Sequence, residues 1–339
     1  MTPTHYSRET MAGKPVLYAP ARSVINMNSG FAPKLLCDGP TFSTGLACVY
    51  SCTYCYVPSV YRKLLHGVLA GRDHSDVVVR REDALKIMRG QLLKRDGSPK
   101  YYDATDTRVI YSSPAVDVAA NMELVAETVE ACKLILELTN WQIRLLSKSS
   151  FLPIIAQRLL EWSNSILPDH DDHRNVKGRL IFGVSTGTLD DKLAAAIEPS
   201  TANVSKRIAS IHLLQDDGWR TFGMICPSLP QNDYRLFADE MHKALRADRM
   251  EHVWAEPMNV RGQSFENTIV ALLHGGFSEE ARWLEIVSKS KSAWEGYARQ
   301  TFLAHRDLYD AGQLRFLQYV NDGNRLWWQT QQEKGAVLL

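Results

Sequence analysis

The sequence has few cysteines and no long apolar run, and both absences narrow the kind of protein that it encodes. Its 339 residues contain 6 cysteines, far too few for a disulfide-scaffolded chain of this size. No apolar run of about 18 residues is present, and the N-terminus, MTPTHYSRETMAGKP, lacks the apolar core of a signal peptide. We therefore expect a cytoplasmic protein without membrane-spanning helices.

The chain also lacks a large net charge. It has 39 Lys and Arg against 38 Asp and Glu, so the whole molecule does not have the charge of a nucleic-acid or membrane binder. Any such contact has to come from a local patch. Segment 61–95 is a candidate, with nine Lys or Arg against four Asp or Glu. It is either the solvated face of a helix or a basic surface that meets phosphate.

Short β-rich runs alternate with longer helical patterns between about residues 41 and 262. The helical stretches include Met122–Leu138 and Val204–Gln215, where apolar residues recur every three or four positions. This alternation is typical of βαβ units around a parallel sheet. The candidate strands are Thr41–Ala47, Arg108–Ser112, Gln142–Ser147, Arg179–Ser185, Thr221–Cys226 and Glu251–Glu256.

Six such units predict an α/β protein with a partial (β/α)6 barrel, related to the closed eight-unit form. Residues 1–40 have Gly and Pro breaks and are expected to form an N-terminal lead-in or cap. Residues 41–262 would form the barrel. Residues 263–339 would form a mainly helical C-terminal extension, helical throughout 278–313 and followed by the Trp-rich tail RLWWQTQQ.

Three of the cysteines form one tight group, Cys48-x3-Cys52-x2-Cys55, at the end of the first candidate strand. Three thiolates in one loop can bind three irons of a cubane, and no fourth cysteine follows nearby. The fourth iron would then have an open coordination site for chemistry. Cys37, Cys132 and Cys226 stand apart and are expected to be reduced structural thiols.

Zinc is the competing interpretation of the cysteine group. Structural zinc takes four ligands, commonly as two spaced pairs. The chain offers no second Cys-x2-Cys and no His-x3–5-His, which argues against zinc.

With Tyr54 just before the third cysteine, the group resembles the motif of the radical S-adenosylmethionine (SAM) superfamily. The resemblance implies a [4Fe–4S] cluster whose unique iron chelates the amino and carboxylate groups of SAM. It further implies reductive cleavage of SAM to methionine and a 5′-deoxyadenosyl radical, which abstracts hydrogen from substrate. The electron would come from an external donor of the flavodoxin or ferredoxin type.

The rest of the barrel resembles the spore photoproduct lyase-like branch, which also contains many "DNA repair photolyase" proteins. Five segments in the expected order carry the similarity over about residues 40–262. They are YSSP with Asp117 downstream, RLLSKSS, FGVSTGTLDDKLAAAIEPSTANVSKRI, DDGWRTFGMICPSLP and WAEPMNVRG.

This narrower resemblance implies a set of SAM contacts at strand ends, where barrel enzymes place their chemistry. Lys148 would contact the SAM carboxylate, although it could also be a surface lysine after a strand. Ser185 and Ser113 would donate hydrogen bonds, with Ser112 a close alternative to Ser113. Tyr54 would offer its backbone to the adenine and shield the cluster with its ring.

Glu198 and Arg207 admit two interpretations. They form either a structural ion pair or a unit that brings Arg207 near the SAM carboxylate. Glu256, Asn259 and Arg261 follow the sixth candidate strand and could face cofactor or substrate, or form a salt-bridged barrel rim.

One position departs from the branch. Photoproduct lyases place a hydrogen-donating cysteine at the end of the second strand, where this chain has Ser112 and Ser113. Cys226, near the end of the fifth candidate strand, is the free thiol that could take that role. The departure makes literal photoproduct repair doubtful, and the part from Phe265 onward has no likeness to the lyase.

Three functions are compatible with these observations. The favoured one is a radical SAM enzyme whose substrate is a nucleobase, in DNA or as a nucleotide. The second is radical modification of a peptide or protein side chain, although no further cysteines for auxiliary clusters are present. The third is a non-catalytic Fe–S binding or sensor protein. The first is motivated by the basic segment and by aromatics that could stack on bases: Tyr56, Tyr61, Tyr101, Tyr102, Trp327 and Trp328.

Overall fold

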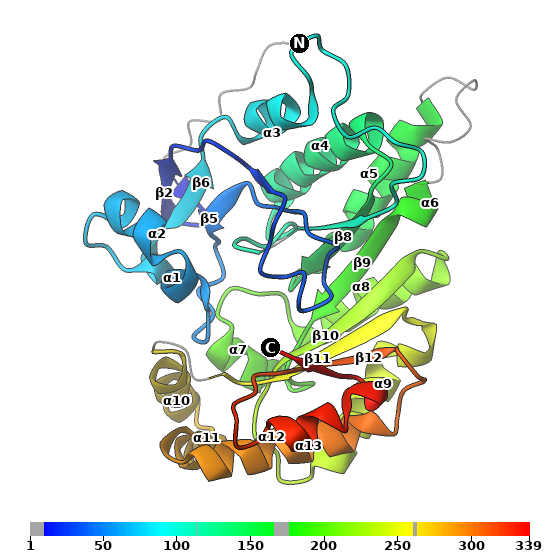
Figure 1. Ribbon diagram of the computed structural model, residues 1–339. Helices are drawn as coiled ribbons and strands as arrows, with labels where there is room; N and C mark the ends of the chain where they lie inside the picture. Colours follow the sequence, from blue (N-terminus) through cyan, green and yellow to red (C-terminus); the bar gives the residue numbers. More distant parts are fainter. Residues whose placement is uncertain (1–9, 113, 166–175, 260–262) are drawn as a thin grey trace.

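A large, mostly parallel sheet forms the centre of the computed structural model, which describes residues 10–112, 114–165, 176–259 and 263–339 (Figure 1). Within these residues the strand order is β13-β12-β11-β10-β9-β8-β7-β4-β3, and the pairs are parallel except the edge pair β3–β4. The strands are β3 (Ile25–Asn26), β4 (Thr41–Phe42), β7 (Val109–Ser112), β8 (Gln142–Ser147), β9 (Leu180–Ser185), β10 (Arg220–Ser228), β11 (His252–Pro257), β12 (Leu314–Gln318) and β13 (Ala336–Leu338).

Helices connect the strands, as expected for successive βα units. In helix α4, for example, the Asn121 side chain fixes the N-terminus by accepting from the amides of Glu123 and Leu124. The helices are α1 (Val57–Val60), α2 (Arg62–Leu69), α3 (Ala84–Leu92), α4 (Met122–Leu138), α5 (Leu152–Ser165), α6 (Val176–Arg179), α7 (Asp191–Ile197), α8 (Val204–Asp216), α9 (Tyr234–Leu245), α10 (Ser264–His274), α11 (Ser278–Lys289), α12 (Lys291–Arg306) and α13 (Arg325–Gln329).

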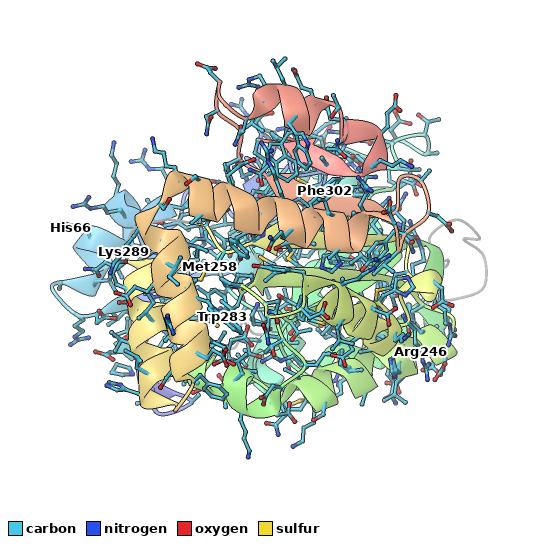
Figure 2. The ribbon with its side chains drawn as sticks, turned by 90° about the horizontal axis from the view of Figure 1, so that it is seen from below. His66, Arg246, Met258, Trp283, Lys289 and Phe302 are labelled. Carbon is cyan, nitrogen blue, oxygen red and sulfur yellow. The ribbon has the colours of Figure 1, made fainter. Side chains whose placement is uncertain are left out.

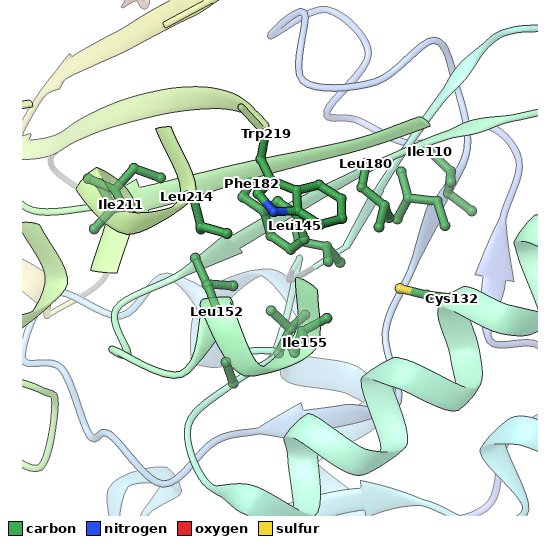
Figure 3. Close-up of a cluster of buried hydrophobic side chains, with 14 of the residues drawn as sticks. Ile110, Cys132, Leu145, Leu152, Ile155, Leu180, Phe182, Ile211, Leu214 and Trp219 are labelled. Atoms are coloured by element: carbon green, nitrogen blue, oxygen red, sulfur yellow. The ribbon is translucent and has the colours of Figure 1, made fainter. Parts of the chain in front are cut away.

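The outer face of the sheet carries the largest core. Alternate side chains of a strand point to one face, and on β9 Leu180 and Phe182 point outward. Helices α5 and α8 cover them with Leu152 and Leu214 (Figure 3). Cys132 of α4 is fully buried in the same core, which suits a structural thiol.

Residues 29–38, here called the plug segment, lie against the inner face of the sheet. Leu36 packs there with Phe222 and Trp254. The indole of Trp254 donates to the Lys34 carbonyl at 2.8 Å, and Arg144 donates to the Leu36 carbonyl at 2.6 Å. Part of the expected N-terminal lead-in, the plug segment, therefore packs against the inner face of the sheet, whereas β1 and β2 belong to a separate sheet.

A second, smaller sheet has the order β1-β2-β6-β5 and lies beside α1 and α2 (Figure 1). The single strand expected over Thr41–Ala47 is wrong, because it divides into β4 of the large sheet and β5 of the small one. A turn separates them, in which Ser43 donates to the Gly45 carbonyl at 2.9 Å. The strands of the small sheet are β1 (Thr10–Met11), β2 (Lys14–Ala19), β5 (Gly45–Ala47) and β6 (Val78–Arg81).

The predicted fold class is confirmed: the chain has a mixed α/β fold consistent with a partial TIM-like barrel. The strand over Gln142–Ser147 and the helix over Met122–Leu138 have the predicted bounds. Arg179 is not part of β9, because it ends α6 and its guanidinium binds the carbonyls of Leu136, Thr139 and Trp141.

The C-terminal extension differs from the prediction in one respect. Helices α10 to α13 make it mainly helical, but β12 and β13 add two strands to the large sheet beside β11. Phe302 of α12 contacts Phe316 and Trp328, with ring centroids 5.2 and 5.3 Å apart, between this helix and the C-terminal segment (Figure 2). The boundary between residues 262 and 263 remains a prediction.

None of the helices in the described ranges combines the length and the apolarity that a membrane span requires.

His305 of α12 is buried, and neither ring nitrogen has a hydrogen-bond partner among the described residues. Burial, together with a smaller effect of nearby His242, lowers the pKa of His305 to about 4. Protonation therefore favours the unfolded chain, so the stability of the neutral form is lost as the pH falls from about 6.5 to about 4. His305→Phe is expected to remove about 2 kcal/mol of that loss at pH 5.

Urea unfolding of both proteins at pH 8 and pH 5 measures the difference. The exposed His274, replaced by Gln, is the control and should leave the pH dependence of the parent chain unchanged. Equal acid sensitivity of His305→Phe and the parent would refute the prediction.

Candidate active site

The cysteine loop leaves the small sheet directly after β5 and turns into α1. The amide of Thr53 donates to the Ile197 carbonyl at 3.0 Å, and its hydroxyl lies 2.9 Å from that of Thr268. The loop is thus fixed to the end of α7 and to α10. Cys48, Cys52 and Cys55 all line one cavity.

That cavity lies at the carboxyl ends of the central strands and has a volume of about 1210 Å³. Pockets for single small ligands usually measure about 300–1,000 Å³, so this one has room for more than one. Its walls include the plug segment, β8 to β11, and helices α1 and α2.

Four polar residues follow one another along these strand ends, and we call them the strand-end arc: Lys148, Ser185, Cys226 and Glu256. The Lys148 ammonium donates to the Ser185 hydroxyl at 2.7 Å, and Ser185 donates to the Cys226 carbonyl at 3.3 Å. The Cys226 thiol in turn donates to Glu256 Oε2 at 3.4 Å. All four residues line the cavity.

Lys148 is the cation of the arc nearest to the cysteine loop. Its Nζ lies 5.6 Å from the ring centroid of Tyr54 and 3.7 Å from Glu198 Oε1. Burial lowers the pKa of Lys148, while the Cys52 thiol opposes that change. An anionic group of a ligand in the cavity would find here a cation held at a fixed place.

Glu198 and Arg207 form a buried ion pair with Nη2 and Oε2 at 2.5 Å. Arg207 also donates to the carbonyls of Ala202 and Ser185, at 2.7 and 3.1 Å, and the Tyr54 hydroxyl donates to Glu198. Burial raises the pKa of Glu198 to about 7, and Arg207 opposes that rise.

Of the two interpretations of this pair, the structure shows the ion pair. Neither side chain lines the cavity. The pair stands behind Tyr54, Lys148 and Ser185 and holds all three through the contacts above.

Cys226, the candidate hydrogen donor, is held on the cavity wall by the Glu256 carboxylate. Glu256 also accepts from Asn259 at 2.7 Å and lies 3.6 Å from Lys34 Nζ. Burial raises the pKa of Cys226, and Glu256 adds to that effect, so the thiol keeps its hydrogen. Glu256 and Asn259 face the cavity, as one interpretation expected.

Several predicted residues lie elsewhere. Ser113 and Arg261 lie outside the described residues, and the role of Ser113 stays a prediction. The basic segment is divided: Lys63 and Arg81 line the cavity, while Arg80 is buried against Glu127.

The aromatic set is divided in the same way. Tyr56 and Tyr61 line the cavity, whereas Tyr101 packs on Trp141 with ring centroids 5.3 Å apart. Trp328 is fully buried in the C-terminal core, so the prediction that it could stack on a substrate base is wrong.

Three residues at the site were not singled out from the sequence. Lys34 and Phe31 belong to the plug segment and line the cavity. Asp117, quoted above only as part of a motif, accepts from the Ser147 hydroxyl at 2.7 Å and the Lys148 amide at 2.8 Å. It fixes the strand end that carries Lys148.

The cysteine group fits the donor set of an iron–sulfur cluster, because its three free thiols line one cavity. In the described parts of the chain no three His, Cys, Asp or Glu side chains are placed to hold one metal ion. The cysteines of a cubane bind different irons and need not converge on one point. The three thiols are unpaired, and burial raises the pKa of each, to about 12 for Cys55. A bound metal would convert them to thiolates.

Comparisons with known proteins give one distant relative in sequence. Uncharacterized protein ORF301 of Acidianus two-tailed virus is 21% identical over 258 residues, which are 75% of this chain and 78% of that protein. No protein-family model matches the chain.

Among solved structures, the chain is similar to spore photoproduct lyase. The lyase complexed with dinucleoside spore photoproduct aligns with a TM-score of 0.50 and 12% identity, over 76% of this chain and 66% of that one. Two lyase variants give the same TM-score at 13% and 12% identity: one with dinucleoside spore photoproduct, one also with bound AdoMet. They align over 65% and 66% of their length, just under two thirds.

The resemblance inferred from the motifs is thus confirmed at the level of the fold, which is similar to that of spore photoproduct lyase.

Proposed function

We propose that this chain is a radical SAM enzyme in which Cys48, Cys52 and Cys55 hold a [4Fe–4S] cluster. The observation that carries the proposal is that these three thiols share one cavity with Lys148 and Ser185. When bound, the cluster supplies the electron that cleaves SAM to methionine and a 5′-deoxyadenosyl radical. A flavodoxin- or ferredoxin-type donor would provide that electron.

The chain's own residues bind and orient SAM. Lys148 neutralises its carboxylate, since a charge-assisted hydrogen bond is the strongest contact that the arc offers. Ser185 adds a hydroxyl, and the Tyr54 backbone meets the adenine. Ser113 would be a further donor. Glu198 and Arg207 act as positioning residues through Tyr54, Lys148 and Ser185.

The favoured substrate is a nucleobase, in DNA or as a nucleotide. The volume of the cavity supports it, because about 1210 Å³ exceeds the usual range for a pocket that holds one small ligand. Phe31, Tyr56 and Tyr61 line the cavity and offer faces for stacking, and Arg22, Lys63 and Arg81 line it with positive charge. The dinucleoside ligand of spore photoproduct lyase points in the same direction.

We further propose that Cys226 returns a hydrogen atom to the substrate radical. Its S–H bond breaks as a C–H bond forms, and the thiyl radical left on Sγ takes one electron from the external donor and one proton from solvent. The position of the thiol on the cavity wall, where it donates to Glu256 at 3.4 Å, supports this role.

Anaerobic reconstitution with iron and sulfide, followed by dithionite and SAM, tests the proposal. We expect about four irons per chain and formation of 5′-deoxyadenosine. Cys55→Ala should give only background, whereas Cys132→Ala, which removes a thiol from the outer core, should retain activity. No 5′-deoxyadenosine from the parent protein would overturn the enzyme claim, and appreciably more iron would favour a peptide-modifying enzyme.

The same assay in D2O, with dinucleoside spore photoproduct as the probe, tests Cys226. A thiol exchanges with solvent, so a donor role places solvent deuterium in the product. Cys226→Ala should lower that incorporation and leave 5′-deoxyadenosine formation intact. If the parent protein incorporates deuterium, equal incorporation by Cys226→Ala would remove Cys226 from the mechanism.

A further inference from the structure

The turn between the first two cysteines is supported from outside the cavity by a lysine of the small sheet. Lys14, at the start of β2, donates from Nζ to the Val49 carbonyl at 2.8 Å and also to the Ser51 hydroxyl. Its third bond goes to the Ser75 carbonyl at 2.8 Å. Lys14 does not line the cavity, so it touches the loop from behind.

The loop needs this support because its backbone is not self-sufficient. Ser51 has φ +54°, a left-handed conformation that is uncommon for residues other than glycine. Its hydroxyl donates to the same Ser75 carbonyl, at 2.7 Å. Lys14 and Ser75 thus fix both residues that flank Tyr50 in the Cys48-x3-Cys52 turn.

The charge of Lys14 also lies within the electrostatic range of the thiols. Burial lowers the pKa of Lys14, while Cys48, Asp76 and Cys52 raise it. Within the described residues no carboxylate lies at ion-pair distance from Lys14, and Asp76 acts on its charge from farther away. Lys148 acts on Cys52 from the cavity side, and Lys14 acts from the opposite side.

We propose that Lys14 is a positioning residue for the cluster that both fixes the Cys48–Cys52 turn and raises the cluster's reduction potential. The inference rests on the proposed function. A cation beside three thiolates stabilises the state that carries one more electron, because net charge near a cluster sets its potential. The electron comes from the external donor, and Lys14 itself is neither oxidised nor deprotonated.

Reconstituted Lys14→Met is compared with the parent chain for iron and sulfide content and for midpoint potential, followed by EPR in a redox titration. We expect lower iron content and, in the loaded fraction, a roughly tenfold smaller ratio of reduced to oxidised cluster at a given potential. That ratio corresponds to a midpoint about 59 mV more negative. Lys14→Arg keeps the charge and should stay within about threefold of the parent ratio. Lys86→Met removes an exposed lysine of α3 and should change neither quantity.

A Lys14→Met protein with parental iron content and parental midpoint overturns the inference. Loss of iron with an intact circular dichroism spectrum supports the positioning role, and a merely structural lysine would leave the midpoint of the loaded fraction unchanged. Should Lys14→Met not fold, Lys14→Gln, which donates hydrogen bonds without charge, takes its place. If the parent chain itself binds no cluster, the proposed function fails, an outcome distinct from a failure confined to the Lys14 variants.

Discussion

Replacing Lys148 with methionine is expected to weaken SAM binding by about 10- to 100-fold without lowering the iron content of the reconstituted protein. Lys148 is the cavity-lining cation of the strand-end arc, held by Ser185 at 2.7 Å and placed over the Tyr54 ring. Methionine keeps the length of the side chain and removes the charge. A charge-assisted hydrogen bond contributes about 1.5–3 kcal/mol, which gives that range.

Equilibrium binding of SAM to the oxidised, reconstituted protein measures the effect. Lys86→Met is the matched control, because the Lys86 side chain is 84% exposed. Its affinity for SAM should equal that of the parent chain. An unchanged dissociation constant for Lys148→Met would mean that the SAM carboxylate is bound elsewhere.

Glu198→Gln is expected to lower the free energy of unfolding by about 3 kcal/mol at pH 8. At that pH the Glu198 carboxyl, whose pKa burial raises to about 7, is largely ionised in the folded protein. The substitution leaves the guanidinium of Arg207 buried without its counter-charge. An unpaired buried charge is far more destabilising than the loss of an exposed pair.

Glu285→Gln provides that comparison, because Glu285 pairs with Lys289 on the surface of α11 at 2.5 Å. Its loss should change stability by less than about 0.5 kcal/mol. Combining Glu198→Gln with Arg207→Met should lose less than the sum of the two single changes, since no unpaired charge remains. A loss below about 1 kcal/mol for Glu198→Gln would show that Arg207 is satisfied by backbone carbonyls alone.

Local signals made the central part of the fold predictable. The strand over Gln142–Ser147 and the helix over Met122–Leu138 have the predicted bounds, because a buried parallel strand and a capped amphipathic helix each have a clear period. The two C-terminal strands could not be predicted in the same way. Each is short, and β13 is held by pairing to β12, a contact that its three residues do not encode alone.

The residues of the site could also be predicted only in part. Cys48, Cys52 and Cys55 are close in sequence, and their grouping in space followed from spacing alone. Lys34 and Lys14 reach the site from the N-terminal part of the chain. Lys14, for example, lies 37 residues before Ser51, whose side chain it contacts. Such contacts depend on how the segment before the barrel folds back, and no periodic pattern in residues 1–40 specifies that path.

The plug segment forms one wall of the cavity, which Phe31 and Lys34 line. It occupies the inner face of the sheet, where its carbonyls at Lys34 and Leu36 are bound by Trp254 and Arg144. The same cavity is lined by α1, α2 and the strand ends. The N-terminal segment is thus part of the site itself, so a truncation that removes residues 29–38 would remove a wall of the cavity together with the side chains of Phe31 and Lys34.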